Sequence, residues 1–281
     1  MAEFFTALGH VPFFLLTISI LYWTWDKRAI SRVTIALLLT AHVNLWLKDF
    51  FQDPRPSAYF MEGHATNTYG LPSGHTQEAL VFWYALALEI RKRWAWIVGT
   101  IFVFGISFSR LYLGVHDLED VVGGAILGVA TLAAYLVYLR FRERVPRLTW
   151  IAPIGLFAAI VSLFFWPNAI PPPDAAVLLV GYFLGWLSGI ALEETRCDFK
   201  KKPPTRRTVQ AVLLGLVAVM VLAGGLGLGF WFLVERGWLW DYLAIAMGST
   251  ATGFFVAFLA PCLFVRAGLM DRGVTPGSPR A

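Results

Sequence analysis

The chain has 281 residues, of which 58% are hydrophobic and only 15% are charged, and its formal net charge is +5 at pH 7. A soluble globular domain carries about 25% charged residues, so this composition excludes that class and indicates a membrane protein. The positive charge gathers at the ends of apolar segments, which indicates contact with anionic lipid headgroups and not with nucleic acid.

Nine apolar segments follow one another along the chain, each close to the ~20 residues that a helix needs to cross a bilayer. They cover residues 9–25, 33–47, 76–90, 94–109, 118–139, 148–166, 174–193, 208–234 and 240–264. No basic stretch precedes the first segment, so we expect a retained helix and not a cleaved signal peptide. The pattern predicts an all-α protein, a polytopic bundle of transmembrane helices.

The basic residues between these segments predict how the bundle is oriented. If the connections alternate between the two sides of the membrane, one side receives only four of the 23 basic residues: Lys48, Arg55, Arg110 and Arg236. Because basic residues concentrate on the cytoplasmic side, we expect the crowded side to be cytoplasmic and the N-terminus to face outward. Cys197 and Cys262 both lie near the cytoplasmic side, where neither a disulfide nor a cysteine metal site is expected.

Composition divides the chain into four parts. Residues 1–147 contain five of the predicted helices and are expected to form a helical core, and residues 148–195 add further core or flanking helices. Residues 196–266 begin with a polar, basic loop and continue as a C-terminal pair of helices. Residues 267–281 form a tail with several Gly, Pro and Ser residues, which we expect to be poorly ordered.

Three glycines, Gly181, Gly185 and Gly189, recur every four residues on the seventh predicted helix. This spacing places them on one helix face, and small residues let transmembrane helices approach closely. We therefore expect this face to pack against another helix, in preference to forming a lipid groove.

Three polar segments lie on the side of the membrane that has few basic residues. The first contains Lys48 and Arg55, the second is Pro72-Ser73-Gly74-His75, and the third contains Ser109, Arg110, His116 and Asp120. Three of the four cations on this side belong to these segments, although the charge rule disfavours cations there. Phosphate binding is a physical reason to keep them, because Arg supplies forked donors and Lys a compact charge.

His116 and Asp120 lie four residues apart at the start of the fifth apolar segment, so a helix would place them on one face. The carboxylate can then hold one ring nitrogen and leave the other free as a nucleophile, as in a catalytic triad. An alternative explanation is a helix-starting acidic cluster. Asp117 and Glu119 stand beside Asp120, and acidic residues are favoured in a first helical turn.

The segment Pro72-Ser73-Gly74-His75 leads directly into the third apolar segment. Its glycine lets the backbone approach an oxyanion, free amides at a helix N-terminus favour negative charge, and the Ser73 hydroxyl adds a donor. His75 is placed there to donate a proton to a leaving oxygen. The same tetrapeptide is also an ordinary turn and helix cap.

The remaining histidines, His10, His42 and His64, have no partners at a catalytic spacing. We expect His42 to be a packed or hydrogen-bonded helix residue and His64 to lie at the membrane surface. A metal site at the other two histidines would need converging ligands, and the three neighbouring cations would repel a metal ion. We therefore expect no metal and no cofactor.

The three segments in this order resemble the signature of the type 2 phosphatidic acid phosphatase (PAP2) family, which is related to vanadium haloperoxidases. The family pattern is K-x6-R-P, then P-S-G-H, then S-R-x5-H-x3-D, and the chain matches each part with the family spacing. The resemblance covers about residues 10–140. The helices that follow this core, about three in number, resemble a longer branch that includes sphingosine-phosphate-phosphatase-like proteins.

The resemblance implies a metal-free mechanism through a phosphohistidine. His116 would attack phosphorus, Asp120 would orient it, and His75 would protonate the leaving oxygen and then activate water. The residues implied to bind the phosphate oxygens are Lys48, Arg55, Ser73, Gly74 and Arg110.

We therefore expect an integral membrane phosphatase that hydrolyses a phosphomonoester or diphosphate of an amphipathic lipid: polyprenyl diphosphate, phosphatidic acid or a sphingoid-base phosphate. Two alternatives stay open, a lipid phosphotransferase that uses the same intermediate and a catalytically silent transporter or scaffold. The expected partners are this phospholipid or isoprenoid phosphate substrate and membrane lipids, with no nucleic acid. The expected location is a bacterial cytoplasmic (inner) membrane, with the active site on the extracytoplasmic face.

Overall fold

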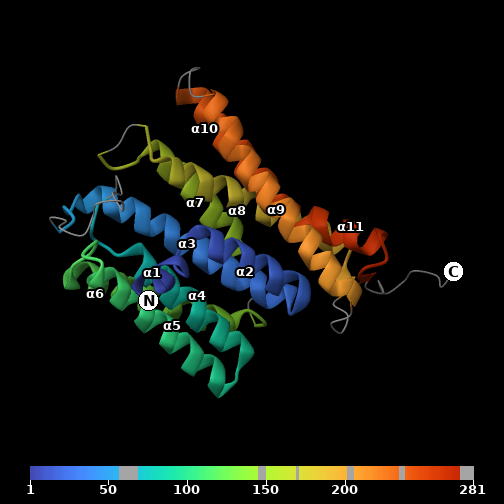
Figure 1. Ribbon diagram of the computed structural model, residues 1–281, viewed down its shortest axis with the longest axis horizontal. Helices are drawn as coiled ribbons and strands as arrows, with labels where there is room; N and C mark the ends of the chain where they lie inside the picture. Colours follow the sequence, from blue (N-terminus) through green and yellow to red (C-terminus); the bar gives the residue numbers. More distant parts are fainter. Residues whose placement is uncertain (57–68, 145–149, 169–170, 201–205, 234–237, 273–281) are drawn as a thin grey trace. The chain divides into compact units, whose positions relative to one another are not determined.

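The computed structural model describes the chain except for residues 57–68, 145–149, 169–170, 201–205, 234–237 and 273–281 (Figure 1). Side chains are also not described over residues 225–238. His64, Arg236 and most of the predicted tail therefore lie outside the described residues.

Helices account for nearly all of the described secondary structure. They are α1 (Ala2–Ala7), α2 (Val11–Thr24), α3 (Lys27–Phe51), α4 (Gly74–Ile90), α5 (Arg93–Tyr112), α6 (Leu118–Phe141), α7 (Ile151–Phe164), α8 (Asp174–Arg196), α9 (Arg206–Leu233), α10 (Trp238–Phe254), the π-helical turn η3 (Phe255–Leu259) and α11 (Ala260–Arg266). Two short strands, β1 (Phe199–Lys200) and β2 (Asp271–Arg272), pair antiparallel.

Each predicted apolar segment coincides with a helix. Six stretches of the described chain are long and apolar enough to cross a membrane: α3, α5, α6, α8, the described part of α9, and the continuous run from α10 through η3 to α11. Helices α2 and α7 are shorter apolar helices. The predicted all-α, polytopic architecture is confirmed, and the protein is an integral membrane protein. The figure of nine crossings stays a prediction.

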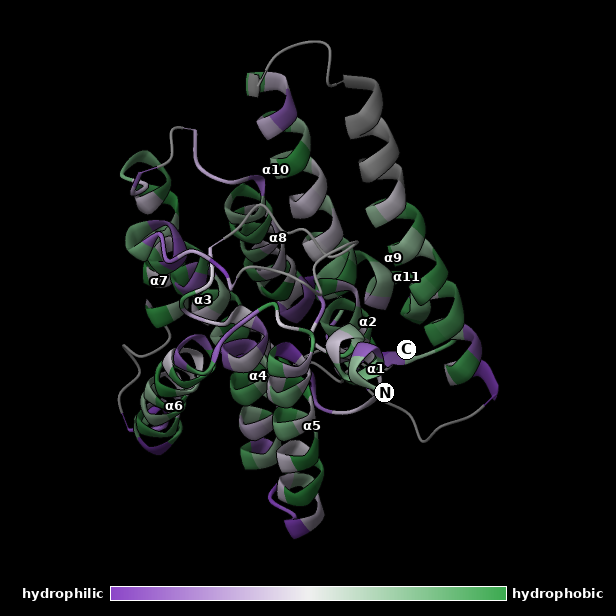
Figure 2. Ribbon diagram, turned by 60° about the vertical axis from the view of Figure 1, so that its left-hand side comes forward, coloured by the Kyte–Doolittle hydropathy of each residue, from purple (hydrophilic) through white to green (hydrophobic). Residues whose placement is uncertain are grey.

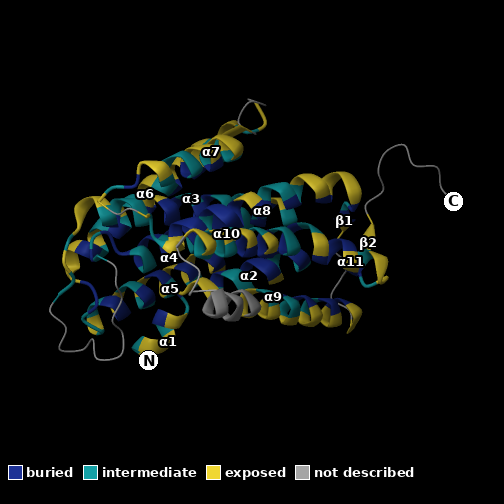
Figure 3. Cartoon of the chain, turned by 90° about the horizontal axis from the view of Figure 1, so that it is seen from above, coloured by how far each residue is buried: buried dark blue, intermediate teal, exposed yellow. Residues whose placement is uncertain are grey.

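Apolar side chains face outward along the helices. On α5, Ile97, Ile101, Phe104 and Phe108 are 57–71% exposed and recur at the three- and four-residue spacing of one helix face. Hydrophobic residues run along the helices while hydrophilic ones gather toward their ends and in the loops (Figure 2), and exposed residues line the outer sides of helices such as α7 (Figure 3). Contiguous exposed apolar surface of this kind is suited to lipid tails and not to water.

The described chain forms two compact units, which do not follow the chain order. The first consists of Met1–Leu15 and Arg32–Ala176. Within it, α4 packs against both α5 and α6, and α1 packs against α5. Polar contacts at Glu89 join α3, α4 and α6. Arg32 donates to both oxygens of Glu89, at 2.8 and 2.7 Å, and Tyr135 donates to the same carboxylate at 2.6 Å.

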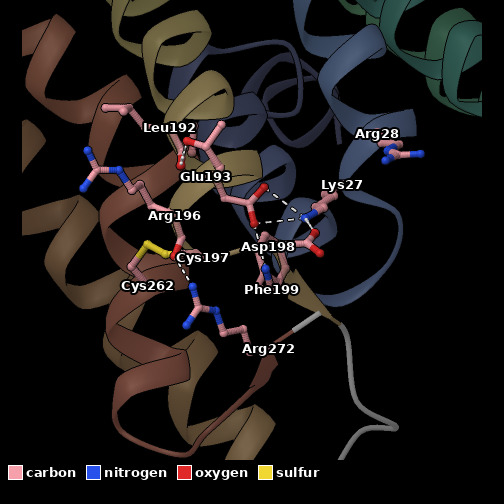
Figure 4. Close-up of polar contacts among 12 residues, drawn as sticks. Lys27, Arg28, Leu192, Glu193, Arg196, Cys197, Asp198, Phe199, Cys262 and Arg272 are labelled. Carbon is pink, nitrogen blue, oxygen red and sulfur yellow. Dashed lines mark hydrogen bonds and ion pairs between the residues drawn. A yellow bond between two sulfur atoms is a disulfide. The ribbon is translucent and has the colours of Figure 1, made fainter. Parts of the chain in front are cut away.

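The second unit consists of Leu16–Ser31 and Val177–Ala281. The buried Trp23 donates its indole N–H to the carbonyl of Val256 at 2.9 Å, which anchors α2 to the π-helical turn. Lys27 is the first residue of α3. Its Nζ lies 2.9 Å from Glu193 Oε1 and 2.9 Å from Asp198 Oδ1 (Figure 4). The fully buried Glu193 thus has a charged partner, as a buried carboxylate requires. The division of the sequence at residues 147, 195 and 266 stays a prediction.

Cys197 and Cys262 form a disulfide in the second unit, so the expectation of unpaired cysteines was wrong. The antiparallel pair of β1 and β2 draws the end of α8 toward α11, and the two Cα atoms lie 5.5 Å apart. That separation is in the range that disulfides require. The expectation rested only on the predicted cytoplasmic side. A disulfide also requires that the two cysteines lie close together in the fold, which their separation along the chain does not reveal.

The glycine face of α8 packs against α10 and the turn that follows it, as predicted. A side chain added at Gly181 would meet Ser249, and one added at Gly185 would meet the backbone carbonyl of Thr250. One added at Gly189 would meet the Cβ of Ala257. The small residues therefore serve a close helix contact inside the second unit.

This packing predicts that Gly185→Ala lowers the stability of the protein. The added methyl group overlaps backbone, and overpacking of this kind costs about 1–3 kcal/mol. The matched control is Gly224→Ala in α9, where an added Cβ has nothing within 4 Å. Thermal unfolding in detergent should show a lower Tm for the first variant and an equal or higher Tm for the second. Equal Tm values for Gly185→Ala and wild type would contradict the close contact.

Candidate active site

The eight predicted site residues all lie in the first unit and come from the three polar segments. Lys48 is in the last turn of α3, and Arg55 follows that helix. Ser73 is the N-cap of α4, and Gly74 and His75 are its first two residues. Arg110 is in the last turn of α5, His116 lies in the loop after α5, and Asp120 is in the first turn of α6. The structure brings these segments together, and Lys48 interacts electrostatically with Arg55, Arg110 and Asp120.

The expected pair of His116 and Asp120 is present and buried. His116 Nδ1 lies 2.8 Å from Asp120 Oδ2, and the two side chains are 2% and 1% exposed. The acidic neighbour Asp117 has a different role, because its carboxylate accepts from the Asp120 backbone N–H at 2.9 Å and caps α6. The acidic cluster therefore starts the helix and also supplies the partner of the imidazole, so the two explanations offered for it are compatible.

The second nitrogen of His116 faces a cation. Its Nε2 lies 3.2 Å from Arg55 Nη1, and the same Nη1 donates to the Val115 carbonyl at 2.7 Å. With the Nδ1 proton held by Asp120, Nε2 carries the lone pair that accepts from Arg55. Burial lowers the pKa of His116 to about 4, the bond to Asp120 opposes this shift, and Lys48 and Arg55 add to it. The imidazole is therefore neutral at pH 7.

The backbone holds Lys48 inside the protein. Lys48 is 6% exposed and donates to the carbonyls of Tyr69 and Gly70 at 2.7 and 2.8 Å. Its ammonium group therefore does not reach out to the membrane surface. A Cβ on Gly70 would lie 2.9 Å from both carboxylate oxygens of Asp120, so this glycine lets the loop that holds Lys48 pass close to the carboxylate.

A residue of the N-terminal helix α1 positions Arg110. Arg110 is 4% exposed and donates from Nη1 to the Thr6 hydroxyl at 3.3 Å. The Thr6 hydroxyl lies 2.9 Å from the hydroxyl of Ser109, which itself donates to the Ile106 carbonyl at 2.6 Å. Thr6 is therefore the donor to Ser109 and the acceptor from Arg110. The Nε of Arg110 is buried and has no hydrogen-bond partner among the described residues.

The segment Ser73–His75 caps α4 at the site. Ser73 is fully buried at the N-cap, and its backbone N–H donates to the Asp120 carbonyl at 2.9 Å. A Cβ on Gly74 would lie 2.9 Å from Asn44 Oδ1, so a larger residue would crowd this turn. The His75 ring packs edge-on against His10, with centroids 4.8 Å apart. In the described part of the chain, its buried Nε2 has no hydrogen-bond partner.

Sequence reasoning missed a polar network behind α4. Asn44 donates to the Pro72 carbonyl at 3.2 Å and to Gln77 Oε1 at 2.8 Å, and Gln77 donates to the Thr40 hydroxyl at 2.7 Å. The signal was available, because Thr40, Asn44 and Lys48 recur every four residues on one face of a membrane helix, and polar residues inside such a helix mark functional interiors. Thr6 had no comparable signal, since its contact with Ser109 spans most of the first unit's sequence.

Of the two other described histidines, one lies away from this arrangement and one borders it. His42 Nε2 lies 2.7 Å from the Ser162 hydroxyl and its ring packs against Trp166, as expected for a hydrogen-bonded helix residue. His10 contacts the site through the ring of His75. Across the described ranges, no group of three or more His, Cys, Asp and Glu side chains could hold a metal ion.

Two family profiles match the chain. Residues 29–146 match the PAP2 superfamily, and residues 177–272 match the transmembrane extension of PAP2 superfamily phosphatases. The first match contains all eight site residues, and the second covers most of α8 and the described helices after it. Together the two matched segments cover more than half of the chain.

Several curated proteins are similar to parts of this chain. A sphingosine-1-phosphate phosphatase 2 from Mus musculus is 25% identical over 47% of this chain and 40% of its own length. Lipid phosphate phosphatase delta from Arabidopsis thaliana is 28% identical over 47% of this chain and 37% of its own length. A lipid A 4'-phosphatase from Bacteroides thetaiotaomicron is 30% identical over 46% of this chain and 62% of its own length.

The chain spans less than half the length of the first two relatives. No solved structure matches it. The two profile matches, the first of which contains the three polar segments, establish that the chain belongs to the PAP2 superfamily.

Proposed function

We propose that the protein is a membrane lipid-phosphate phosphatase that works through a phosphohistidine at His116 and needs no metal ion. One observation carries this proposal. The His116 ring is held at Nδ1 by Asp120, 2.8 Å away, while its neutral Nε2 faces the guanidinium of Arg55 at 3.2 Å. A nucleophile oriented by a carboxylate beside a cation fits attack on a phosphoryl group.

In the first step, the Nε2 lone pair of His116 attacks phosphorus and the bond from phosphorus to the lipid oxygen breaks. Burial and the neighbouring Arg110 lower the pKa of His75 well below 6.5, so the ring takes up its proton together with the negatively charged substrate. The protonated His75 then gives its Nε2 proton to that leaving oxygen. The phosphorylated imidazole carries a positive charge, which the Asp120 carboxylate stabilises at Nδ1. In the second step water attacks phosphorus, His75 takes the proton from the water, and the N–P bond breaks to release inorganic phosphate and neutral His116.

The charge on the transferring group is balanced by the surrounding donors. Lys48, Arg55 and Arg110 supply the positive charge, and the Ser73 hydroxyl and the backbone at Gly74 supply further hydrogen bonds. Arg110 and His75 each have a buried nitrogen with no partner among the described residues. Buried polar groups normally have a partner, so these two nitrogens are available to substrate oxygens.

We propose a lipid phosphate as the substrate class. The relatives are named for phosphatase action on sphingosine 1-phosphate, a lipid phosphate and lipid A, which share a phosphate on an apolar anchor. Tails of these lipids fit the exposed apolar faces of the helices. We assign the site to the extracytoplasmic face of a bacterial inner membrane. The connections predicted on the same side of the membrane as the site contain few other basic residues, as expected for that face.

The proposal predicts that His116→Ala abolishes phosphate release while the protein still folds. The assay measures inorganic phosphate from sphingosine 1-phosphate, dioleoyl phosphatidic acid and farnesyl diphosphate in micelles that contain a metal chelator. Wild type should release phosphate from at least one of these lipids under the same conditions. Turnover by His116→Ala at the wild-type rate, or wild-type activity that the chelator removes, would contradict the mechanism.

The two neighbouring carboxylates give a matched pair of variants. Asp120→Asn should lower the rate by roughly 10⁴-fold, the size of the effect when the carboxylate of a serine-protease triad becomes an amide. Asp117→Asn should keep most of the wild-type rate, because Asn caps a helix about as well as Asp. Equal losses in the two variants would mean that α6 capping, and not orientation of His116, explains the role of Asp120.

The depressed pKa of His116 predicts that its ring stays neutral at pH 5.5. An ordinary imidazole with a pKa of about 6.5 would be mostly protonated there, whereas His116 gains its proton only as the pH falls through about 4. Nitrogen-15 NMR of histidine-labelled protein in micelles reports this directly, with the His116 signal assigned by its loss in His116→Gln. A midpoint at pH 6.5 or above would contradict the buried, cation-facing environment.

A further inference from the structure

A cavity of about 350 Å³ lies in the second unit, where α8, η3 and α11 end near the small sheet. Three of the side chains that line it are Arg196, Arg266 and Arg272. Arg196 is the last residue of α8, Arg266 is the last residue of α11, and Arg272 belongs to β2. None of the proposed catalytic residues lines this cavity.

These arginines have no acidic partner in the described part of the chain. None of them forms an ion pair there, and no described carboxylate lines the cavity. Arg272 Nη2 donates to the Arg196 backbone carbonyl at 3.0 Å (Figure 4), which uses one of the five N–H groups of its guanidinium. Three like charges around one cavity repel one another, so an anion between them would be bound favourably.

The fold holds the arginines in place. Cys197 follows Arg196 in the chain, Cys262 lies one helical turn before Arg266, and the disulfide between these cysteines also lines the cavity. The third arginine is fixed by the pairing of Phe199 with Arg272 in the two-stranded sheet. The charges therefore come from three separate elements that a covalent bond and a strand pair keep together.

The rest of the cavity wall is apolar and exposed. Phe258, Leu259 and Leu263 line it, and the two leucines are 42% and 46% exposed. Two apolar stretches long enough to cross a membrane end at this cavity, Asp174–Arg196 and Leu239–Arg266. The cavity thus lies at the end of two membrane helices and has both charged and apolar side chains in its wall. A free anion would contact only the arginines, whereas a lipid would contact the arginines through its headgroup and the apolar side chains through its acyl chains.

We propose that this cavity binds the phosphate headgroup of an anionic phospholipid, with the acyl chains against the leucines. Arginine suits this role because its forked donors match phosphate oxygens. Basic pockets between transmembrane helices are known to bind lipid headgroups. None of the residues proposed to bind the substrate phosphate lines this cavity, so the bound lipid is a second lipid and not the substrate.

The test is lipid binding by the full chain in a neutral detergent. Native mass spectrometry counts the dioleoyl phosphatidylglycerol and dioleoyl phosphatidylcholine that stay bound from an equimolar mixture. Wild type should retain phosphatidylglycerol in preference. Replacing all three cavity arginines, as R196Q/R266Q/R272Q, should weaken this binding by at least about tenfold.

A matched control removes the same charge elsewhere on the second unit. The variant R28Q/R206Q/R207Q changes three exposed arginines that do not line the cavity, and its phosphatidylglycerol binding should equal that of wild type. Leu263→Trp keeps every charge but fills the cavity, and it should lose binding, which preserves the test if the triple cavity variant fails to fold.

Three results would overturn the proposal. If the control triple variant lost as much phosphatidylglycerol binding as the cavity triple variant, the binding would be general charge attraction. If wild type retained phosphatidylcholine as well as phosphatidylglycerol, the cavity would not distinguish the headgroup charge. Displacement of phosphatidylglycerol by millimolar inorganic phosphate would mean that the cavity takes a free anion and not a lipid.

Discussion

The Asp120 side chain and backbone join two of the three polar segments that form the candidate site. Its side chain binds His116 Nδ1 at 2.8 Å and reaches the Asp117 backbone N–H at 3.3 Å, while its carbonyl accepts from the Ser73 N–H at 2.9 Å. One residue therefore joins the start of α6, the loop before it and the cap of α4. A buried carboxylate needs such partners, because an unpaired charge in an apolar interior is costly.

The same requirement explains how an apolar bundle accommodates three cations. Lys48 and Arg55 donate to backbone carbonyls, and Arg110 donates to the hydroxyl of Thr6. These neutral acceptors satisfy hydrogen bonds without cancelling the charge, so the positive potential remains for an anion. A site paired throughout with carboxylates would be neutral and would attract phosphate poorly.

Sequence reasoning reached the parts of the protein that depend on local spacing. The apolar segments predicted the helices because burial in lipid requires continuous apolar runs, and the four-residue spacing predicted the bond between His116 and Asp120 because neighbours on a helix face are set by its pitch. It failed for contacts between distant segments that no motif marks. The disulfide between Cys197 and Cys262 and the bond between Thr6 and Arg110 depend on tertiary packing, which residue spacing does not encode.

The central claim is that His116 becomes phosphorylated during turnover. Rapid mixing of the protein with a ³²P-labelled lipid phosphate, followed by an alkaline quench and peptide mapping by mass spectrometry, tests it most directly, because phosphohistidine survives alkali. The account predicts label on His116 in an early burst that decays as inorganic phosphate appears. Label on another residue, such as Ser73, or full turnover with no labelled protein at any time, would contradict it.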